Sequence, residues 1–214
     1  MTVTRSGRSD ETALTGIGDR IREERVQASM SQRELARRLG LSPSMISQIE
    51  SGQTLPSVAT LWSIVTELDL SLDSVIRGGD TAEPLVETSG PGELAEPDGP
   101  VVRSDQRRSV RLDTGVRWEE LSPGDEEGVD FVRATYEVGG SSTTDESLMR
   151  HSGREYGYVL VGTLGIQIGF QEFELGPGDS IAFDSTTPHR LFNKGDVPVE
   201  AVWFVANRHG PDQV

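Results

Sequence analysis

The sequence predicts two small domains of different fold class, an all-α domain in the first third of the chain and an all-β domain in the last half. Before residue 77, apolar residues recur every three to four positions, as in the stripe from Val58 to Leu68, which is the period of an amphipathic helix. After residue 105, short runs rich in Val, Ile, Phe, Tyr and Trp alternate with Gly and Pro turns, a pattern typical of an antiparallel barrel or sandwich. Five such runs are predicted strands: 129–138, 156–161, 164–170, 180–183 and 199–205.

The segment between the two patterns, residues 78–105, is rich in Gly, Pro and acidic residues and has no hydrophobic period. We expect a flexible acidic linker there. The predicted organisation is then a polar disordered arm over residues 1–12, the helical domain over 13–77, the linker, the β-domain over 106–207 and a polar tail over 208–214.

Charge is divided unevenly between the two predicted domains. The 214 residues carry a net charge of −15 at pH 7, which by itself disfavours a nucleic-acid partner. Residues 1–78 hold nine Arg against ten Asp and Glu, a net of −1, so residues 79–214 hold the other 11 basic and 25 acidic side chains, a net of −14. Any DNA must therefore meet a locally basic face of the first half.

The sequence lacks three features that mark particular classes of protein: cysteine, a long apolar run and an apolar segment near its start. The chain has no cysteine, which excludes disulfides and thiolate metal sites. It has no apolar run of about 18 residues, so we expect no membrane span. The opening Met1–Ser6 leads into charged residues rather than an apolar segment, so we expect no secretory signal and a cytoplasmic protein.

Residues 31–51 predict two short helices separated by a tight turn. Ser31 and Glu34 have the spacing of a capping box, in which each side chain reaches the backbone N–H of the other. Gly40 supplies the left-handed residue that ends the first helix, and Ser42 followed by Pro43 starts the second. A helix-turn-helix and an ordinary αα-hairpin both fit this pattern.

The outward face of the second helix favours the helix-turn-helix. With Ile46 and Ile49 turned inward, Ser44, Ser47 and Gln48 point outward beside Ser42. These are short polar side chains and one amide, which suit the edges of bases. We expect no acidic or bulky apolar side chain to block this face.

Residues 31–52, which read SQRELARRLGLSPSMISQIESG, together with Pro56-Ser57 and the helix that follows, resemble the Cro/cI-type (XRE) family. The match covers about residues 14–76. The resemblance implies a five-helix domain that places Pro43–Glu50 in the major groove of an operator. It also implies a homodimer that reads two half-sites about 34 Å apart.

The resemblance implies DNA contacts position by position. Gln32 holds a phosphate, and Arg33 and Arg37, one helical turn apart, contact the DNA backbone. A solvated helix face is the alternative for these arginines and is the interpretation we prefer for Arg38. The residues that face bases or backbone are Ser42, Ser44, Ser47 and Gln48.

Two of the three histidines of the chain stand beside predicted strands. His151 precedes Glu155 by four residues at the start of an apolar strand, and His189 follows a later turn and strand. In an extended chain, His151 and Glu155 point into one cavity only if the backbone bends between them, and Gly153 provides such a bend. His209 lies in the polar tail, and we assign it no role.

Residues 129–206 resemble the cupin superfamily, which implies a small double-stranded β-helix with a ligand cavity. Matched to the cupin motifs, His151, Glu155, His189 and Asn193 stand at motif positions, whereas Met149 replaces the first motif histidine. Two histidines and one carboxylate suit Fe(II), Mn(II), Ni(II) or Zn(II). The alternative is that these residues line a metal-free effector pocket.

Strand position predicts the wall of that pocket. Its four aromatic residues are either ligand contacts or ordinary core: Tyr136, Tyr158, Phe183 and Trp203.

These patterns together favour a sequence-specific DNA-binding transcriptional regulator, not an enzyme, whose β-domain senses a small molecule directly or through a divalent metal. The alternative is an iron-dependent cupin oxidoreductase that retains a helix-turn-helix domain, and the His151, Glu155 and His189 set supports it. The polar outward face of the second helix and the lack of a further general base or nucleophile favour the regulator. A toxin-binding antitoxin would need an interaction surface in place of the cupin domain.

Overall fold

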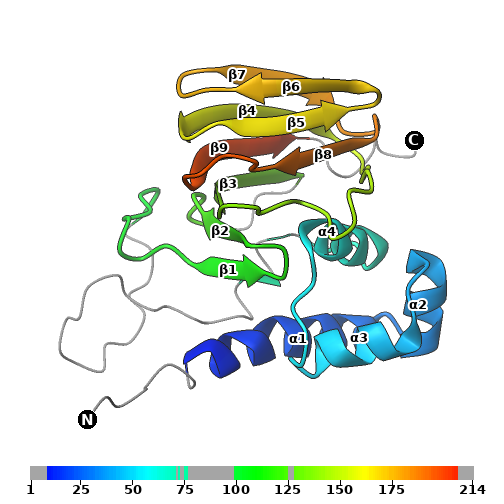
Figure 1. Ribbon diagram of the computed structural model, residues 1–214. Helices are drawn as coiled ribbons and strands as arrows, with labels where there is room; N and C mark the ends of the chain where they lie inside the picture. Colours follow the sequence, from blue (N-terminus) through cyan, green and yellow to red (C-terminus); the bar gives the residue numbers. More distant parts are fainter. Residues whose placement is uncertain (1–8, 71, 73–74, 77–98, 125–127, 207–214) are drawn as a thin grey trace, which may run out of the picture.

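The computed structural model describes residues 9–70, 72, 75–76, 99–124 and 128–206, with side chains from residue 16 onward. Within this part of the chain, four helices come first and nine strands follow (Figure 1). This order confirms the predicted succession of an α-domain and a β-domain. The first eight residues of the predicted arm, most of the predicted linker and the predicted tail lie outside the described residues.

The helices are α1 Ser9–Gln27, α2 Gln32–Leu39, α3 Pro43–Glu50 and α4 Val58–Glu67. The prediction of five helices is corrected to four with complete bounds, although Leu72, Val75 and Ile76 are also helical and buried. Residues 9–12, predicted to be disordered, belong to α1.

The turn between α2 and α3 has the predicted caps. Ser31 accepts a hydrogen bond from the Glu34 N–H, Gly40 ends α2 with φ of 68°, and Ser42 accepts from the Met45 N–H. The capping box is only half formed, because the Glu34 carboxylate pairs with Arg37 and Arg38 rather than reaching back to Ser31. Glycine suits position 40 because residues with a Cβ are disfavoured in this left-handed conformation.

A buried ion pair joins α1 to α3. Arg25 Nε lies 2.5 Å from Glu50 Oε1, and both side chains are almost fully buried. Glu50 is the last residue of α3, so this pair holds the C-terminal end of α3 against α1. A buried pair of this kind is costly to break, because the remaining charge is left without a partner.

The strands form two antiparallel sheets. The six-stranded sheet has the order β1-β2-β3-β9-β4-β7, and the three-stranded sheet has the order β6-β5-β8. The strands are β1 Ser109–Leu112, β2 Val116–Glu120, β3 Val129–Tyr136, β4 Arg154–Val161, β5 Leu164–Ile168, β6 Gln171–Leu175, β7 Ser180–Asp184, β8 His189–Phe192 and β9 Val199–Ala206. The all-β class predicted for this domain is confirmed.

The two sheets face each other and enclose the core of the β-domain. Leu191 of β8 lines the same cavity as Val132 of β3 and Trp203 of β9. Figure 1 shows α4 as the helix nearest the strands. The backbone joins them: the Ala59 N–H donates to the Ser142 carbonyl at 3.0 Å, and the Asp113 N–H donates to the Pro56 carbonyl at 3.1 Å.

Candidate functional site

The outward face of α3 is polar, as the sequence predicts. Ser44, Ser47 and Gln48 are exposed, while Ile46 and Ile49 are buried against the rest of the helical domain. Ser42 is exposed and caps the helix through Met45. One expectation is corrected: Met45 is 38% exposed, because it lies one position before the buried Ile46, at the border of the polar face.

The three arginines of α2 lie in different environments. Arg33 is exposed, whereas Arg37 and Arg38 both pair with Glu34 and lower its pKa to about 2. Exposed pairs of this kind contribute little to stability. Arg37 therefore loses little free energy when it leaves Glu34 to bind a DNA phosphate. Arg38 also binds Glu67 of α4 at 2.8 Å, so it joins α2 to α4, and its assignment to a solvated helix face rather than to DNA stays a prediction.

Gln32 makes a contact that the sequence pattern does not suggest. Its Nε2 donates to Glu50 Oε2 at 2.8 Å, and the residue is half-buried. The amide therefore supports the buried Arg25–Glu50 pair, and a phosphate contact for Gln32 stays a prediction.

Two substitutions separate base reading from phosphate binding at this face. Gln48→Ala should relax preference at one base position and cost about 1–3 kcal/mol of discrimination, whereas Arg33→Ala should weaken binding to all sequences alike and lower the salt slope by about one unit. Titrations of operator and random DNA at several salt concentrations measure both effects. Equal effects of the two variants on both DNAs would show that the recognition face is assigned wrongly.

The β-domain brings together the three predicted metal-ligating residues. His151 precedes β4, Glu155 is the second residue of β4, and His189 begins β8. Nε2 of His151 and of His189 lie 2.9 Å and 3.0 Å from the same oxygen, Glu155 Oε1. All three side chains are buried. Gly153 supplies the predicted bend with φ of 108°, a conformation that other residues rarely adopt.

Neighbouring groups orient each member of this cluster. Nδ1 of His151 lies 3.0 Å from the Ser152 carbonyl, and Nδ1 of His189 lies 2.9 Å from the Thr187 carbonyl. Carbonyls accept only, so Nδ1 of each ring carries a proton and Nε2 is the nitrogen left to face Glu155. The Trp203 indole N–H donates to the other Glu155 oxygen. Gly157 makes room for that indole, because a Cβ at position 157 would overlap the ring.

The electrostatics of the cluster favour an ionised carboxylate. Burial by itself raises the pKa of Glu155, but the adjacent His151 and His189 rings more than offset this, so its pKa lies below the usual value. Burial lowers and the Glu155 carboxylate raises the pKa of His189, and the net shift is upward. The cluster thus holds a negative charge where two nitrogens converge.

The donor set fits a divalent cation. The two Nε2 atoms and Glu155 Oε1 have no hydrogen-bond partner of acceptable geometry despite their burial, and one ligand atom from each residue lies within 4.8 Å of the others. Buried polar atoms without partners are rare. Backbone carbonyls that fix the histidine tautomer are the usual support of histidine metal ligands.

Met149 and Asn193 stand where the cupin resemblance places motif residues. Met149 is buried and pairs directly with His189 across an antiparallel bridge, so their side chains share one face. Asn193 donates to the carbonyls of Tyr136, Glu137 and Val197. It therefore fixes the turn after β8 rather than bonding to the His151–Glu155–His189 cluster.

Helix α4 closes the cavity beside the cluster. The Trp62 ring stacks on the His151 ring with centroids 4.5 Å apart and planes 8° from parallel, and it meets Trp118 edge-on at 6.0 Å. Val58, Trp62 and Leu72 line the cavity from the helical domain. Its volume is about 20 Å³, which is room for about one water molecule or ion.

The four predicted wall residues divide into two groups. Tyr136 and Trp203 line the cavity, burial raises the pKa of Tyr136, and the Phe183 ring meets His189 edge-on at 5.0 Å. Tyr158 is corrected, because it is 47% exposed on the outer side of β4. Strand side chains alternate, and Glu155 points inward, so position 158 points outward. Sequence reasoning missed Trp62, since its contact crosses between domains and no local pattern signals it.

The two domains define a class of DNA-binding regulator with an appended cupin domain. A helix-turn-helix family model matches residues 21–75 and a cupin domain model matches residues 132–205. The chain belongs to the family of HTH-type transcriptional regulators that includes PuuR of Escherichia coli strain K12, with which it shares 30% identity over 178 residues, or 82% of this chain and 86% of PuuR.

Solved structures support the same fold. An HTH_3 family transcriptional regulator from Vibrio cholerae matches with a TM-score of 0.64 and 21% identity over 92% of this chain and 98% of that chain. Hydroxypropylphosphonic acid epoxidase from S. wedmorenis matches with a TM-score of only 0.43 and 19% identity over 91% of this chain and 99% of that chain, which carries no argument about activity. No helix in the described ranges combines the length and apolarity required to cross a membrane.

Proposed function

We propose that the β-domain is a sensor that controls sequence-specific DNA binding by the helical domain. The observation that carries the proposal is the stack of Trp62 on His151, which joins α4 to the His151–Glu155–His189 cluster. Helix α4 is tied in turn to α2 by the Arg38–Glu67 pair. A change at the cluster therefore reaches the helices that carry the DNA-facing residues.

His151, Glu155 and His189 would hold a divalent ion such as Fe(II), Mn(II), Ni(II) or Zn(II). When bound, the ion supplies an open coordination position for an effector atom. The chain's own residues do the rest: Ser152 and Thr187 orient the histidines, Trp203 holds Glu155, and Trp62 covers the cluster.

The size of the cavity beside the cluster determines what can bind there without a rearrangement. A space of about 20 Å³ admits an ion or water but no organic effector. An organic effector at the cluster therefore has to displace Trp62 and with it α4. Binding of effector and close docking of α4 then exclude each other, and that differential affinity is what shifts a conformational equilibrium.

The same cavity bears on the oxidoreductase alternative. Turnover requires an organic substrate beside the cluster, and a substrate, like an effector, would have to displace Trp62 to enter. The cluster retains the ligand set of such enzymes, so the alternative rests on chemistry alone, whereas the regulator also has the interdomain contact in its favour.

We further propose that the regulator acts in the cytoplasm as a homodimer, and that its two facing sheets form the double-stranded β-helix of a cupin. The eight-residue α3 reads too few bases for useful specificity by itself. Two copies bound to half-sites one helical turn apart meet that need.

Selection of genomic fragments by the full chain tests this function. We expect enrichment of paired half-sites about 34 Å apart. We also expect the affinity to differ about 5- to 150-fold between metal-loaded and chelator-treated protein, the usual range of coupling between two sites, because a bound ion fixes the His151 ring on which Trp62 stacks. Electrophoretic titration of the selected site measures the change. Binding without sequence preference at moderate salt would remove the regulator function.

A further inference from the structure

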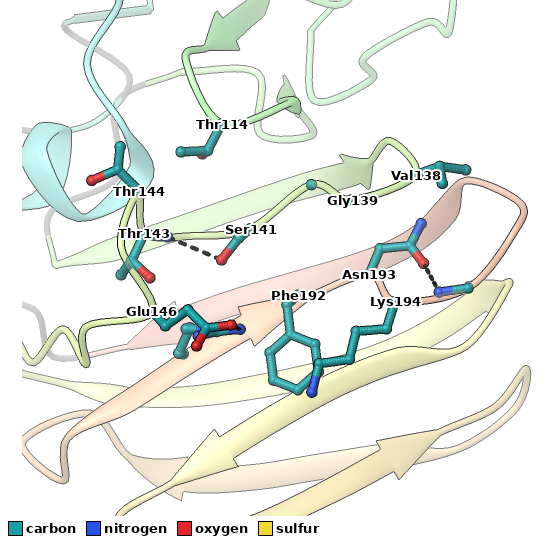
Figure 2. Close-up of a pocket in the computed structure, with 13 residues that line it drawn as sticks. Thr114, Val138, Gly139, Ser141, Thr143, Thr144, Glu146, Phe192, Asn193 and Lys194 are labelled. Carbon is teal, nitrogen blue, oxygen red and sulfur yellow. Dashed lines mark hydrogen bonds and ion pairs between the residues drawn. The ribbon is translucent and has the colours of Figure 1, made fainter.

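A second cavity lies on the opposite side of β8 from the metal-ligating cluster. Arg190 and Phe192 alternate along β8 with His189 and Leu191, which face the interior, so they point to the outer side. The cavity has a volume of about 610 Å³, within the range of small-molecule sites. Figure 2 shows its wall: Thr114 on one side, the segment from Val138 to Glu146 across the middle, and Phe192 and Lys194 on the other side.

Three buried polar atoms in this wall have no hydrogen-bond partner: Thr114 Oγ1, Thr143 Oγ1 and Arg190 Nε. Arg190 is 7% exposed and Thr143 is 4% exposed. Buried polar groups are nearly always hydrogen-bonded. Three unpaired polar atoms around one cavity therefore indicate a ligand that forms hydrogen bonds with them.

The charged residues around the cavity indicate which kind of ligand it binds. The Arg190 guanidinium and Lys194 Nζ lie 4.7 Å and 4.4 Å from the centre of the Phe192 ring. Glu146 is the carboxylate among the lining residues, and its contact with Arg190 Nη2 is long, 3.5 Å, with the Glu146 side chain 82% exposed. Lys194 is already paired with Glu172 Oε1 at 3.1 Å, so Arg190, with its one long contact to Glu146, is the lining cation that is left for an anionic ligand.

We propose that this cavity binds a small organic molecule with an oxyanion group, a carboxylate or a phosphate. The Arg190 guanidinium takes the oxyanion in place of Glu146, in the forked geometry that suits such groups. The Thr114 and Thr143 hydroxyls bond the rest of the molecule, which packs beside Phe192.

The wall of the cavity also touches the helical domain. Thr143 follows Ser142, whose carbonyl accepts from Ala59 in α4, and Thr114 follows Asp113, whose N–H donates to Pro56. An occupant that moves either threonine thus shifts the residues that begin α4. Its action as an effector rests on the proposed function, whereas its binding does not.

Calorimetric titration of the full chain with succinate, benzoate and inorganic phosphate tests the site, with chloride at equal ionic strength as reference. We expect saturable binding of at least one probe, and the better probe identifies the group as carboxylate or phosphate. Arg190→Gln should weaken binding about tenfold or more, the scale of a lost charge-assisted hydrogen bond. Arg154→Gln, which removes an exposed arginine over the Tyr156 ring, should leave it unchanged.

Glu146→Gln keeps the test decisive even if Arg190→Gln folds poorly. The Glu146 side chain is largely exposed, so the variant should fold, and loss of the competing carboxylate should raise probe affinity severalfold. No saturable response above chloride, or equal affinity in native and Glu146→Gln protein, overturns the site. Probe binding is measured without DNA, so failure of the regulator function would leave this result intact.

Discussion

Metal-loaded protein should melt well above chelator-treated protein, and His189→Ala should abolish the difference. The His189 and His151 nitrogens and the Glu155 oxygen converge on one point, and removal of one leaves two ligands, too few to hold a divalent ion against water. A ligand present at about 100 times its dissociation constant adds about 2.7 kcal/mol to the free energy of unfolding. For a chain of this size that is about 5–10 °C in Tm. Thermal denaturation followed by circular dichroism measures it.

Met149→His should enlarge the metal-dependent rise. Met149 and His189 face the same side of their bridge, and directly opposed residues have Cβ atoms about 4.5–5.5 Å apart, so an imidazole at position 149 adds a fourth ligand. His209→Ala is the matched control, because that histidine belongs to the predicted tail, and it should melt as the native chain does. If native, His189→Ala and Met149→His proteins all melt alike with and without metal, the cluster is a metal-free pocket.

Local patterns were enough to predict the helical domain. Ser31, Gly40 and Ser42 cap helices through hydrogen bonds to residues no more than four positions away, so their roles are written in short segments of sequence. The limit appears at Glu34, where two arginines compete successfully for the carboxylate that the capping box requires. It appears again at Gln32, whose partner Glu50 lies 18 residues further along the chain.

The β-domain shows which strands a sequence reveals. The five predicted strands correspond to β3, β4, β5, β7 and β9, while β1, β2, β6 and β8 were not predicted. The missed strands are four or five residues long, and β6 reads QEFEL with four exposed positions, so hydrophobic period gives little signal. In addition, the place of β8 depends on its pairing with β5, which is not its neighbour in sequence.

The cluster was predicted because the positions of its residues match the cupin motifs, whereas the residue that covers it, Trp62, was not predicted. Trp62 is one of the apolar residues that recur every three to four positions in its helix. This periodicity predicts that Trp62 is buried but does not show which residues pack against it. The structure shows a ring from the other domain on each side: Trp118 edge-on and His151 face to face. The prediction that Tyr158 lines the pocket was wrong for a related reason. The inward and outward positions of a strand are known only once one inward residue has been identified.

Trp62→Ala should disconnect DNA binding from the metal site while sequence preference remains. The substitution removes the ring that stacks on His151 and costs about 3–5 kcal/mol of stability, as for other buried Trp residues. It leaves the exposed residues of α3 unchanged. We expect the native protein to change its operator affinity about 5- to 150-fold on metal loading and the variant to show no change, by electrophoretic titration below its melting temperature.

Two further variants separate the stack from general destabilisation. Trp62→Phe keeps an aromatic face against His151 and should retain most of the metal response. Val65→Ala removes buried volume from the same helix at a position that does not line the cavity, so the protein should be less stable yet still respond. A full metal response in Trp62→Ala would show that the signal travels by another route. The backbone hydrogen bonds of Pro56 and Ala59 with the β-domain would then be tested next, because they also join the two domains.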